Sequence, residues 1–253
     1  MNRTKLFSQF INPIGFVLCM FMYTSSVGQI VSSQGLDILL DKWRIGAADS
    51  LSLDFTEKGG EDKMLTQFEG QITYALSIKD KTGEMSVEET KMFMGDEQVY
   101  TMKGNKYRSE MNGMLNMTQI YLGQDTIYSQ MLGAEAVYWI DATRNTDQMI
   151  DYKIEQNVET IAGVECDLLT INSEEGTTKY YFNKKYYSNA KNFKRHKHGF
   201  WNFCMDKTNA IPLKSSIESK DMFIEVTAKN INEAKVSDEA FEIPNLPREA
   251  NPE

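Results

Sequence analysis

The stretch EQVYTMKGNKYRSEMNG, residues 97–113, decides the fold because it has the pattern of a complete β-hairpin. It contains two extended runs, and in the second run Tyr107 and Met111 alternate with charged residues. This period of two is typical of a strand with one buried face. Gly104 and Asn105 separate the runs, and a glycine–asparagine pair favours a two-residue hairpin turn. The segment therefore predicts two antiparallel strands joined by a tight turn.

The same pattern continues on both sides of this hairpin. Before it, residues 70–80 (GQITYALSIKD) alternate apolar and polar side chains, and after it residues 115–132 repeat the hairpin around a Gly-Gln-Asp turn at 123–125. Five later extended runs complete the series: AVYWID, VECDLLTIN, TTKYYFNKK, IPLKSSIES and MFIEVTAKNIN. Together these runs predict about nine to eleven strands.

One amphipathic helix is predicted ahead of the strands, in residues 35–50 (GLDILLDKWRIGAADS). Its apolar residues recur at helical spacing, with charged residues between them. They are Leu36, Leu39, Leu40, Trp43 and Ala47. Because the apolar face of an antiparallel sheet must be covered, we expect a mainly β fold. It would be a curved antiparallel half-barrel of about nine to eleven strands wrapped around this N-terminal helix.

Three segments interrupt the strand pattern. Residues 82–96 are compatible with a short helix or a long loop, and the sequence does not decide between them. Residues 186–209 form a basic, aromatic insertion between strands. Residues 240–253 hold three of the five prolines, so we expect this tail to leave the sheet, with residues 248–253 flexible.

The chain begins with the pattern of a secretory signal peptide. Arg3 and Lys5 precede an apolar stretch over residues 15–23, and a small-x-small motif follows at 26–28. The apolar stretch is far shorter than the roughly 20 residues of a membrane-spanning helix. We therefore predict a signal peptide at residues 1–28 and an exported protein, periplasmic or associated with the outer membrane. An uncleaved signal anchor is the alternative.

Composition indicates one acidic domain. Removal of residues 1–28 would lower the formal net charge from −9 to −11 and leave 225 residues, enough for one well-packed core. We assign residues 29–247 to a single half-barrel domain. An acidic protein of this kind is a poor general binder of nucleic acid, so we expect no nucleic-acid partner. The oligomeric state is not predicted.

The cysteine and histidine residues do not form a recognisable reactive or metal site. Cys166 and Cys204 remain after cleavage, and in an oxidising compartment they would either pair in a disulfide or stay as buried residues. The carboxylates beside Cys166 would raise its thiol pKa, which argues against a nucleophile. His196 and His198 are crowded by lysine and arginine, so we expect a solvated basic loop and no metal site.

Catalytic motifs are absent from the sequence. It contains no glycine-rich phosphate loop, no G-x-S-x-G elbow and no Cys-x-x-Cys pair. Its 36 carboxylates include no pair marked as catalytic. We therefore expect no enzymatic activity and no cofactor.

Several segments together resemble a known family. In order they are FEGQITYALSIKD (68–80), MKGNKYRSEMNG (102–113), ETIAGVECDLLTI (159–171), AIPLKSSIES (210–219) and AFEIPNLP (240–247). They resemble a family of exported Gram-negative envelope proteins, which is similar in turn to the periplasmic carriers and outer-membrane receptors that sort lipoproteins (the Lol type). The resemblance implies a half-barrel whose apolar cavity holds acyl chains. It also implies that residues 160–163 form the turn before the strand that contains Cys166.

The resemblance leads us to expect a cavity on the concave face. The candidate lining residues are Leu39, Trp43, Ile72, Tyr74, Leu76, Met102, Tyr107, Met111, Tyr180, Phe182 and Ile224. Twelve methionines remain after signal removal, and methionine adapts to ligands of varied shape. Ordinary core filling explains them equally well.

Two further features have open roles. An arginine at the position of Arg108 tethers lid or ligand in the related carriers, whereas strand alternation places Arg108 toward solvent. The insertion carries Phe193, Phe200 and Trp201, and it is a lid over the cavity, a docking loop for a membrane or envelope partner, or a plain surface loop.

Two functions follow from these observations. The first is a non-enzymatic, carrier-like envelope protein that binds a lipid or the acyl chain of a lipidated protein. The second is a structural or protein-interaction module with a filled core and no small-molecule ligand. A continuous apolar cavity of several hundred cubic ångströms would favour the first function.

Overall fold

The computed structural model describes residues 66–251, which belong to one compact unit. The predicted signal peptide and the predicted helix at 35–50, with Leu39 and Trp43, lie outside the described residues. Within residues 66–251, no helix is long and apolar enough to cross a membrane.

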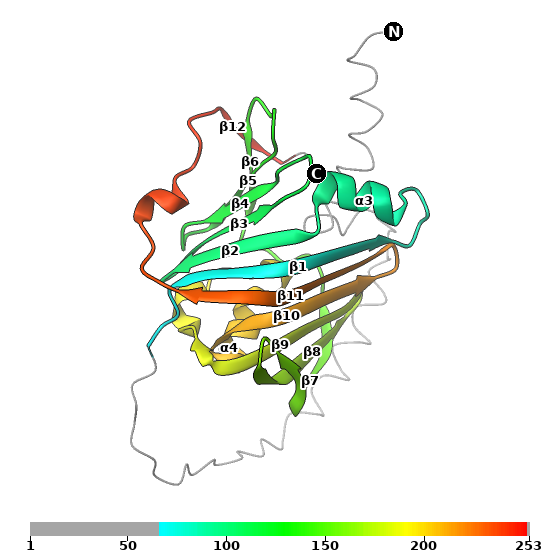
Figure 1. The fold of residues 1–253 in the computed structure, drawn as a ribbon, viewed down its shortest axis with the longest axis vertical. Helices are drawn as coiled ribbons and strands as arrows, with labels where there is room; N and C mark the ends of the chain where they lie inside the picture. The colour runs from blue at the N-terminus through cyan, green and yellow to red at the C-terminus, as the bar shows by residue number, and fades with distance from the viewer. Residues whose placement is uncertain (1–65, 252–253) are drawn as a thin grey trace, which may run out of the picture. The chain divides into compact units, whose positions relative to one another are not determined.

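The described chain is dominated by one twelve-stranded sheet (Figure 1). The strands are β1 (Gly70–Asp80), β2 (Glu97–Lys103), β3 (Lys106–Met111), β4 (Thr118–Tyr121), β5 (Thr126–Gln130), β6 (Val137–Asp141), β7 (Met149–Ile161), β8 (Val164–Ser173), β9 (Gly176–Tyr187), β10 (Ala210–Ser219), β11 (Met222–Glu233) and β12 (Arg248–Ala250). Their order is β12-β6-β5-β4-β3-β2-β1-β11-β10-β9-β8-β7. Every neighbouring pair is antiparallel except β12 and β6.

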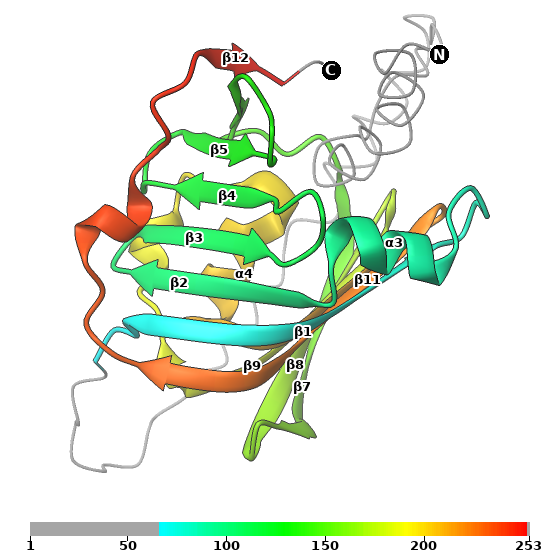
Figure 2. The ribbon, with the colours of Figure 1, turned by 45° about the horizontal axis from the view of Figure 1, so that its top comes forward.

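One short connection requires this sheet to curl. β6 is the second strand in the sheet order and β7 is the twelfth, so they are separated by about 48 Å along the sheet at roughly 4.8 Å per strand. Residues 142–148 join them, and this stretch of chain reaches at most about 28 Å when fully extended. A flat sheet is therefore impossible. Figure 2 shows the resulting curved, open sheet.

The concave face of the sheet is covered by the segment between β9 and β10. This segment contains the 3-10 helices η1 (Ala190–Phe193) and η2 (His198–Phe200) and the helix α4 (Trp201–Thr208). Phe193, Cys204 and Met205 within it have no exposed surface and belong to the main core, together with residues of β1, β3, β4 and β8 to β10. We call residues 188–209 the covering segment.

Polar contacts fix the covering segment on both halves of the sheet. The backbone N–H groups of Lys197 and His198 donate to the carbonyl of Ala142, in the connection between β6 and β7. On the other side, the Tyr180 hydroxyl of β9 donates to the carbonyl of Gly199 at 2.8 Å. The segment therefore links the connection between β6 and β7 to strand β9.

A second helix, α3 (Val87–Met94), lies between β1 and β2 at one end of the sheet (Figure 1). Its start has a capping box, in which the Ser86 hydroxyl accepts from the Glu89 N–H while the Glu89 carboxylate accepts from the Ser86 N–H. Its end meets the β3–β4 connection. A Cβ on Gly113 would lie 2.3 Å from the Gly95 nitrogen, so only glycine permits this backbone contact.

β7 is an edge strand with large exposed apolar side chains. Ile150, Tyr152, Ile154 and Val158 are each more than 40% exposed. Tyr152 and Ile154 pair with the core residues Ile171 and Leu169 of β8, so they continue the concave face toward the edge. Lys153 and Glu155 lie between them and form an ion pair at 2.8 Å. Charged side chains on an edge strand oppose pairing with a further strand.

The structure confirms the predicted mainly β half-barrel and both glycine-centred hairpins, β2–β3 and β4–β5. Residues 82–96, left undecided, contain α3. Two expectations were wrong. Residues 248–250 do not form a free tail, because they pair with β6 in parallel as β12. The turn expected at residues 160–163 is shorter, because β7 continues to Ile161 and the turn lies at Ala162 and Gly163.

The close contact of Gly113 with Gly95 generates a stability prediction. We expect Gly113→Ala to lower the free energy of unfolding by about 2–3 kcal/mol, because the new methyl group would overlap backbone atoms that cannot move aside. Gly104→Ala is the matched control. Gly104 has a φ of +60° and open space around its Cβ position, so the cost there is about 1 kcal/mol. Urea denaturation measures both, and equal losses would contradict the packing argument.

Candidate functional site

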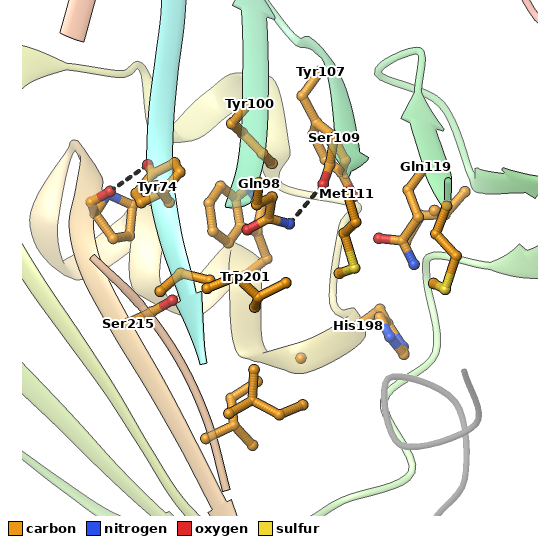
Figure 3. A pocket seen from close by; sticks show the side chains of 18 of the residues that line it. Tyr74, Gln98, Tyr100, Tyr107, Ser109, Met111, Gln119, His198, Trp201 and Ser215 are labelled. Carbon is orange, nitrogen blue, oxygen red and sulfur yellow. Dashed lines mark hydrogen bonds between the residues drawn. The ribbon is translucent and has the colours of Figure 1, made fainter. Parts of the chain in front are cut away.

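An apolar pocket of about 150 Å³ lies between the concave face and the covering segment (Figure 3). One wall comes mainly from the strands β1 to β6 and β9 to β11, and the other from residues 196–201. Strand alternation builds the first wall, because side chains two residues apart point to the same face of a sheet. Tyr107, Ser109 and Met111 thus all project inward from β3.

The pocket lining divides into an aliphatic and an aromatic part. The aliphatic part includes Leu76, Ile78, Met94, Met111, Met117 and Ile224, which form a core cluster of their own with Met222. The aromatic part includes Tyr74, Tyr100, Tyr107, Tyr180 and Trp201. Tyr100 and Tyr107 are stacked with ring centroids 5.0 Å apart, and Trp201 lies within 6.4 Å of both rings. The pocket therefore presents hydrocarbon and ring surfaces to a guest.

Several polar groups in the pocket wall are hydrogen-bonded to other protein groups, whereas the Trp201 Nε1 and His196 Nδ1 atoms are buried without a partner among the described residues. The Tyr74 hydroxyl donates to the carbonyl of Pro212 at 2.8 Å, and the Gln98 amide donates to the Ser109 hydroxyl at 2.6 Å (Figure 3). Burial raises the pKa of Tyr74, Tyr100, Tyr107 and Tyr180, so all four stay neutral at pH 7. A pocket wall without charge suits an uncharged, apolar guest.

His196 is the buried titratable group that joins the covering segment to the sheet. It is only 4% exposed, and its Nε2 lies 2.9 Å from the Tyr107 hydroxyl oxygen. Its ring also contacts Tyr121 edge-on, with centroids 4.6 Å apart. Burial lowers the pKa of His196 to about 3, so the ring is neutral at pH 7. It acts as a neutral hydrogen-bonding spacer between the covering segment and β3.

A second pocket, of about 420 Å³, adjoins the first. The two share Ile140, His198, Gly199, Ile217 and Ile224 as lining residues. The second pocket is the more polar of the two, and its charged lining residues are Asp141, Arg144, Asp147, Glu175 and Glu218. Burial and the neighbouring Asp147 raise the pKa of Glu175 to about 7. We call the smaller, apolar pocket the inner pocket and the larger pocket with charged walls the outer pocket.

The predicted lining residues are all buried where the structure describes them, but they divide between pocket and core. Tyr74, Leu76, Tyr107, Met111, Tyr180 and Ile224 line the inner pocket. Ile72, Met102 and Phe182 pack inside the main core and do not line it. Whether the lining residues bind a ligand remains a prediction.

The covering segment differs from the predicted insertion. The interpretation as a plain surface loop was wrong, because Phe193 is fully buried in the core and Phe200 is only 7% exposed. Phe200 lines the outer pocket and Trp201 the inner one. His196 and His198 were expected in a solvated loop, but His196 is buried and His198 is half-buried and lines both pockets. Sequence alternation could not reveal this, because the segment has no strand period and its aromatic side chains turn inward while its lysines stay exposed.

Arg108 faces away from the pocket, as strand alternation indicated. Its guanidinium forms an ion pair with Glu110 at 2.8 Å and donates weakly, at 3.5 Å, to the carbonyl of Ala240. Ala240 belongs to η3 (Asp238–Phe241), which packs against the outer side of β3. The predicted inward tether is therefore wrong for this arginine, which holds the C-terminal segment on the convex side.

The two cysteines are both buried and free, so the disulfide alternative was wrong. Cys166 lies in β8 as a core residue, as the strand pattern predicted. Burial raises its pKa to about 11 and also raises the pKa of Cys204, so neither is a thiolate at pH 7. Within residues 66–251, no group of three histidine, cysteine or carboxylate side chains has the arrangement of a metal site.

Several lining residues were missed by the sequence analysis. They include Gln98, Tyr100, Ser109, Met117, Gln119, Ile127 and Ile140. Tyr100 and Ser109 were detectable, because they share a face with predicted residues two positions away in β2 and β3. Gln98 and Gln119 were not expected to face the pocket, since a glutamine in a strand is more often exposed.

Comparison with known proteins shows only remote likeness. No protein-family model matches the chain, and no curated protein matches its sequence. Among solved structures, the chain is similar to the lipoprotein LppX of Mycobacterium tuberculosis, with 10% identity over 67% of this chain and 90% of LppX and a TM-score of 0.34. It is also similar to LprF of Mycobacterium bovis, with 7% identity over 67% of this chain and 88% of LprF and a TM-score of 0.30. Likeness at this level carries no argument about function, and membership of the Gram-negative family remains a prediction.

The burial of both thiols predicts their reactivity. We expect a thiol reagent such as dithionitrobenzoate to label neither Cys166 nor Cys204 in the folded protein, because both are inaccessible and protonated. In urea both should react. Intact mass spectrometry before and after labelling measures this. If the folded protein, kept without reductant, has a mass lower by two hydrogen atoms than the mass calculated for free thiols, the two cysteines form a disulfide and the prediction is wrong.

The buried His196 predicts a dependence of stability on pH. An unfolded histidine with a pKa near 6.5 takes up a proton between pH 7 and pH 5, whereas His196 stays neutral down to about pH 3. The unfolded state then binds more protons, so His196 should lower the free energy of unfolding by about 2 kcal/mol over this range. Urea denaturation at pH 7 and pH 5 measures the change.

The control for this prediction is His196→Gln, which keeps a hydrogen-bonding partner for Tyr107 and does not titrate. Its stability should fall by about 2 kcal/mol less between pH 7 and pH 5 than that of the unaltered protein. Glu175 acts in the opposite direction, because its raised pKa favours the folded state on acidification. An unchanged pH dependence in the glutamine variant would refute the role assigned to His196.

Proposed function

We propose that this protein is a non-enzymatic, carrier-like protein of the cell envelope that binds the acyl chain of a lipid or of a lipidated protein. The observation that carries the proposal is the apolar pocket left between the concave face and the covering segment. Acyl chains form no hydrogen bonds, so their binding site needs apolar and deformable walls. The aliphatic side chains and methionines at one part of the pocket supply such walls.

The inner pocket, at about 150 Å³, is smaller than the several hundred cubic ångströms expected, and its size suits the end of an acyl chain. An apolar cavity of about 150 Å³ in another protein admits benzene, so this pocket suits a short hydrocarbon segment of similar bulk. The outer pocket of about 420 Å³ adjoins it and has charged walls. A long-chain amphiphile would therefore place its tail toward Leu76 and Met111, and its polar head among the carboxylates of the outer pocket.

The uncharged aromatic wall supports the same orientation. The Tyr74 hydroxyl and the Gln98 amide already donate hydrogen bonds to other protein groups, so they offer little to a polar headgroup. Burying a charged headgroup there would cost several kcal/mol without compensation. The alternative, a structural module without a ligand, predicts that the pocket stays empty in the native envelope.

The test is binding of a fluorescent fatty acid, together with native mass spectrometry of protein purified from its own envelope. Ser215 of β10 points into the pocket, so Ser215→Phe would fill it (Figure 3). We expect this variant to bind the probe about tenfold more weakly or worse. Thr227→Phe adds the same side chain to the opposite face of the neighbouring strand β11 and should bind like the unaltered protein.

The outcomes separate the two functions. Probe binding that Ser215→Phe alone abolishes, with a co-purified lipid in the native mass spectrum, would support the carrier-like function. Absence of both probe binding and co-purified lipid in the unaltered protein would support a structural module. Thermal unfolding of both variants serves as the control for folding.

A further inference from the structure

Exposed apolar side chains gather at one end of the sheet, where α3 meets two strand connections. Met92 in α3 is 49% exposed, Met114 in the β3–β4 connection is 63% exposed, and Leu132 in the β5–β6 connection is 71% exposed. Half-buried apolar residues lie beside each of them. We call the six residues the methionine rim: Met92, Phe93, Met114, Leu115, Met131 and Leu132.

Backbone hydrogen bonds hold the methionine rim together. The N–H of Met114 donates to the carbonyl of Met92 at 3.0 Å, and the N–H of Leu115 donates to that of Phe93 at 3.1 Å. The N–H of Leu132 donates to the carbonyl of Leu115 at 2.8 Å. Three segments distant in sequence are thus joined side by side, and Figure 2 shows α3 beside the connection that follows β3.

Side-chain contacts lock the same junction. The Asn112 amide oxygen accepts from the N–H groups of Asp96 and Glu97, both at 3.0 Å. Gly95 and Gly113 allow the two backbones to touch at this point. Apolar side chains on such a fixed frame lose little conformational freedom when a partner binds. A contiguous exposed apolar patch on a fixed frame is typical of an interaction surface.

The methionine rim lies directly outside the pocket wall. Phe93, Leu115 and Met131 pack against a buried cluster that includes Met94, Met111 and Met117. Those three methionines line the inner pocket. A partner bound at the rim would therefore contact side chains one layer away from the pocket.

The charges around the methionine rim are mainly acidic. Glu88 and Glu89 on α3 and Glu135 in the β5–β6 connection are exposed. Lys91 is paired with Asp96 at 2.9 Å, which leaves the acidic charges in excess. An acidic border repels an anionic bilayer and attracts a surface with lysine or arginine around its apolar centre. Charge complementarity therefore favours a protein partner over a membrane.

We propose that the methionine rim is a docking surface for a partner protein whose contact face combines apolar side chains with lysine or arginine. The apolar side chains of the partner cover Met92, Met114 and Leu132. Its basic side chains face Glu88 and Glu135. This surface is separate from the pocket and does not depend on the pocket holding a lipid.

The test uses defined probes with the full protein. A synthetic amphipathic helix of leucine and lysine should bind, and a matched helix of leucine and glutamate should not. Met114→Ser/Leu132→Ser should weaken the binding of the leucine–lysine helix by about tenfold, because a few central apolar residues dominate such interfaces. Ile150→Ser/Ile154→Ser removes similarly exposed apolar surface from β7 and should leave binding unchanged. Fluorescence anisotropy at two salt concentrations measures the binding of both helices to the unaltered protein and of the leucine–lysine helix to both variants.

A charge variant and a vesicle probe complete the test. Glu88→Lys/Glu135→Lys should weaken binding of the leucine–lysine helix and remove its salt dependence. Vesicles of phosphatidylglycerol and phosphatidylcholine should not bind the unaltered protein. Absence of helix binding, equal binding by the rim and β7 variants, or vesicle binding that the rim variant abolishes would each overturn the proposal. Circular dichroism of every variant confirms that these exposed substitutions leave the fold intact.

Discussion

The structure depends on the short chain between β6 and β7. These strands lie near opposite edges of the sheet, yet only residues 142–148 join them, so the sheet must curl until its two ends approach each other. Curling creates a concave face, and this face must be shielded from water because its strands present apolar and aromatic side chains. The covering segment meets this need, and its hydrogen bonds to Ala142 fasten it to the connection that produced the curvature.

The covering segment packs tightly against one part of the concave face, which becomes the core, and leaves another part open, which becomes the pocket. Phe193 and Met205 of this segment pack into the main core, and neither side chain has any exposed surface. Toward α3 the segment ends, and the side chains that face the remaining space are largely aliphatic and methionine. His196 marks the boundary, since it bridges to Tyr107 without carrying charge. A neutral bridge leaves this part of the concave face, including its tyrosines, without charge.

Most of the strands, and therefore the fold class, could be predicted from the sequence, because period-two alternation and the glycine turns at 104 and 123 are local signals. α3 also carried a local signal, since Ser86 and Glu89 form the capping box, but the surrounding glycine and charged residues obscured it. The position of residues 188–209 could not be predicted. Its burial depends on contacts with Tyr107, Tyr121 and Ala142, which only the curled sheet brings within reach. The pocket is a consequence of that packing and has no signature along the chain.

The sheet remains unjoined at its margins, with β7 on one side and the short β12 on the other. A closed barrel has a girth fixed by its strand number and stagger. In this open sheet, slight changes of twist at many strand pairs would add up and widen or narrow its concave side. The hydrogen bonds between the strands would stay intact. Residues 142–148, which join β6 to β7, would limit how far the sheet could open. Such a change would be distributed across the whole sheet, so the width of its concave side would adjust without a hinge.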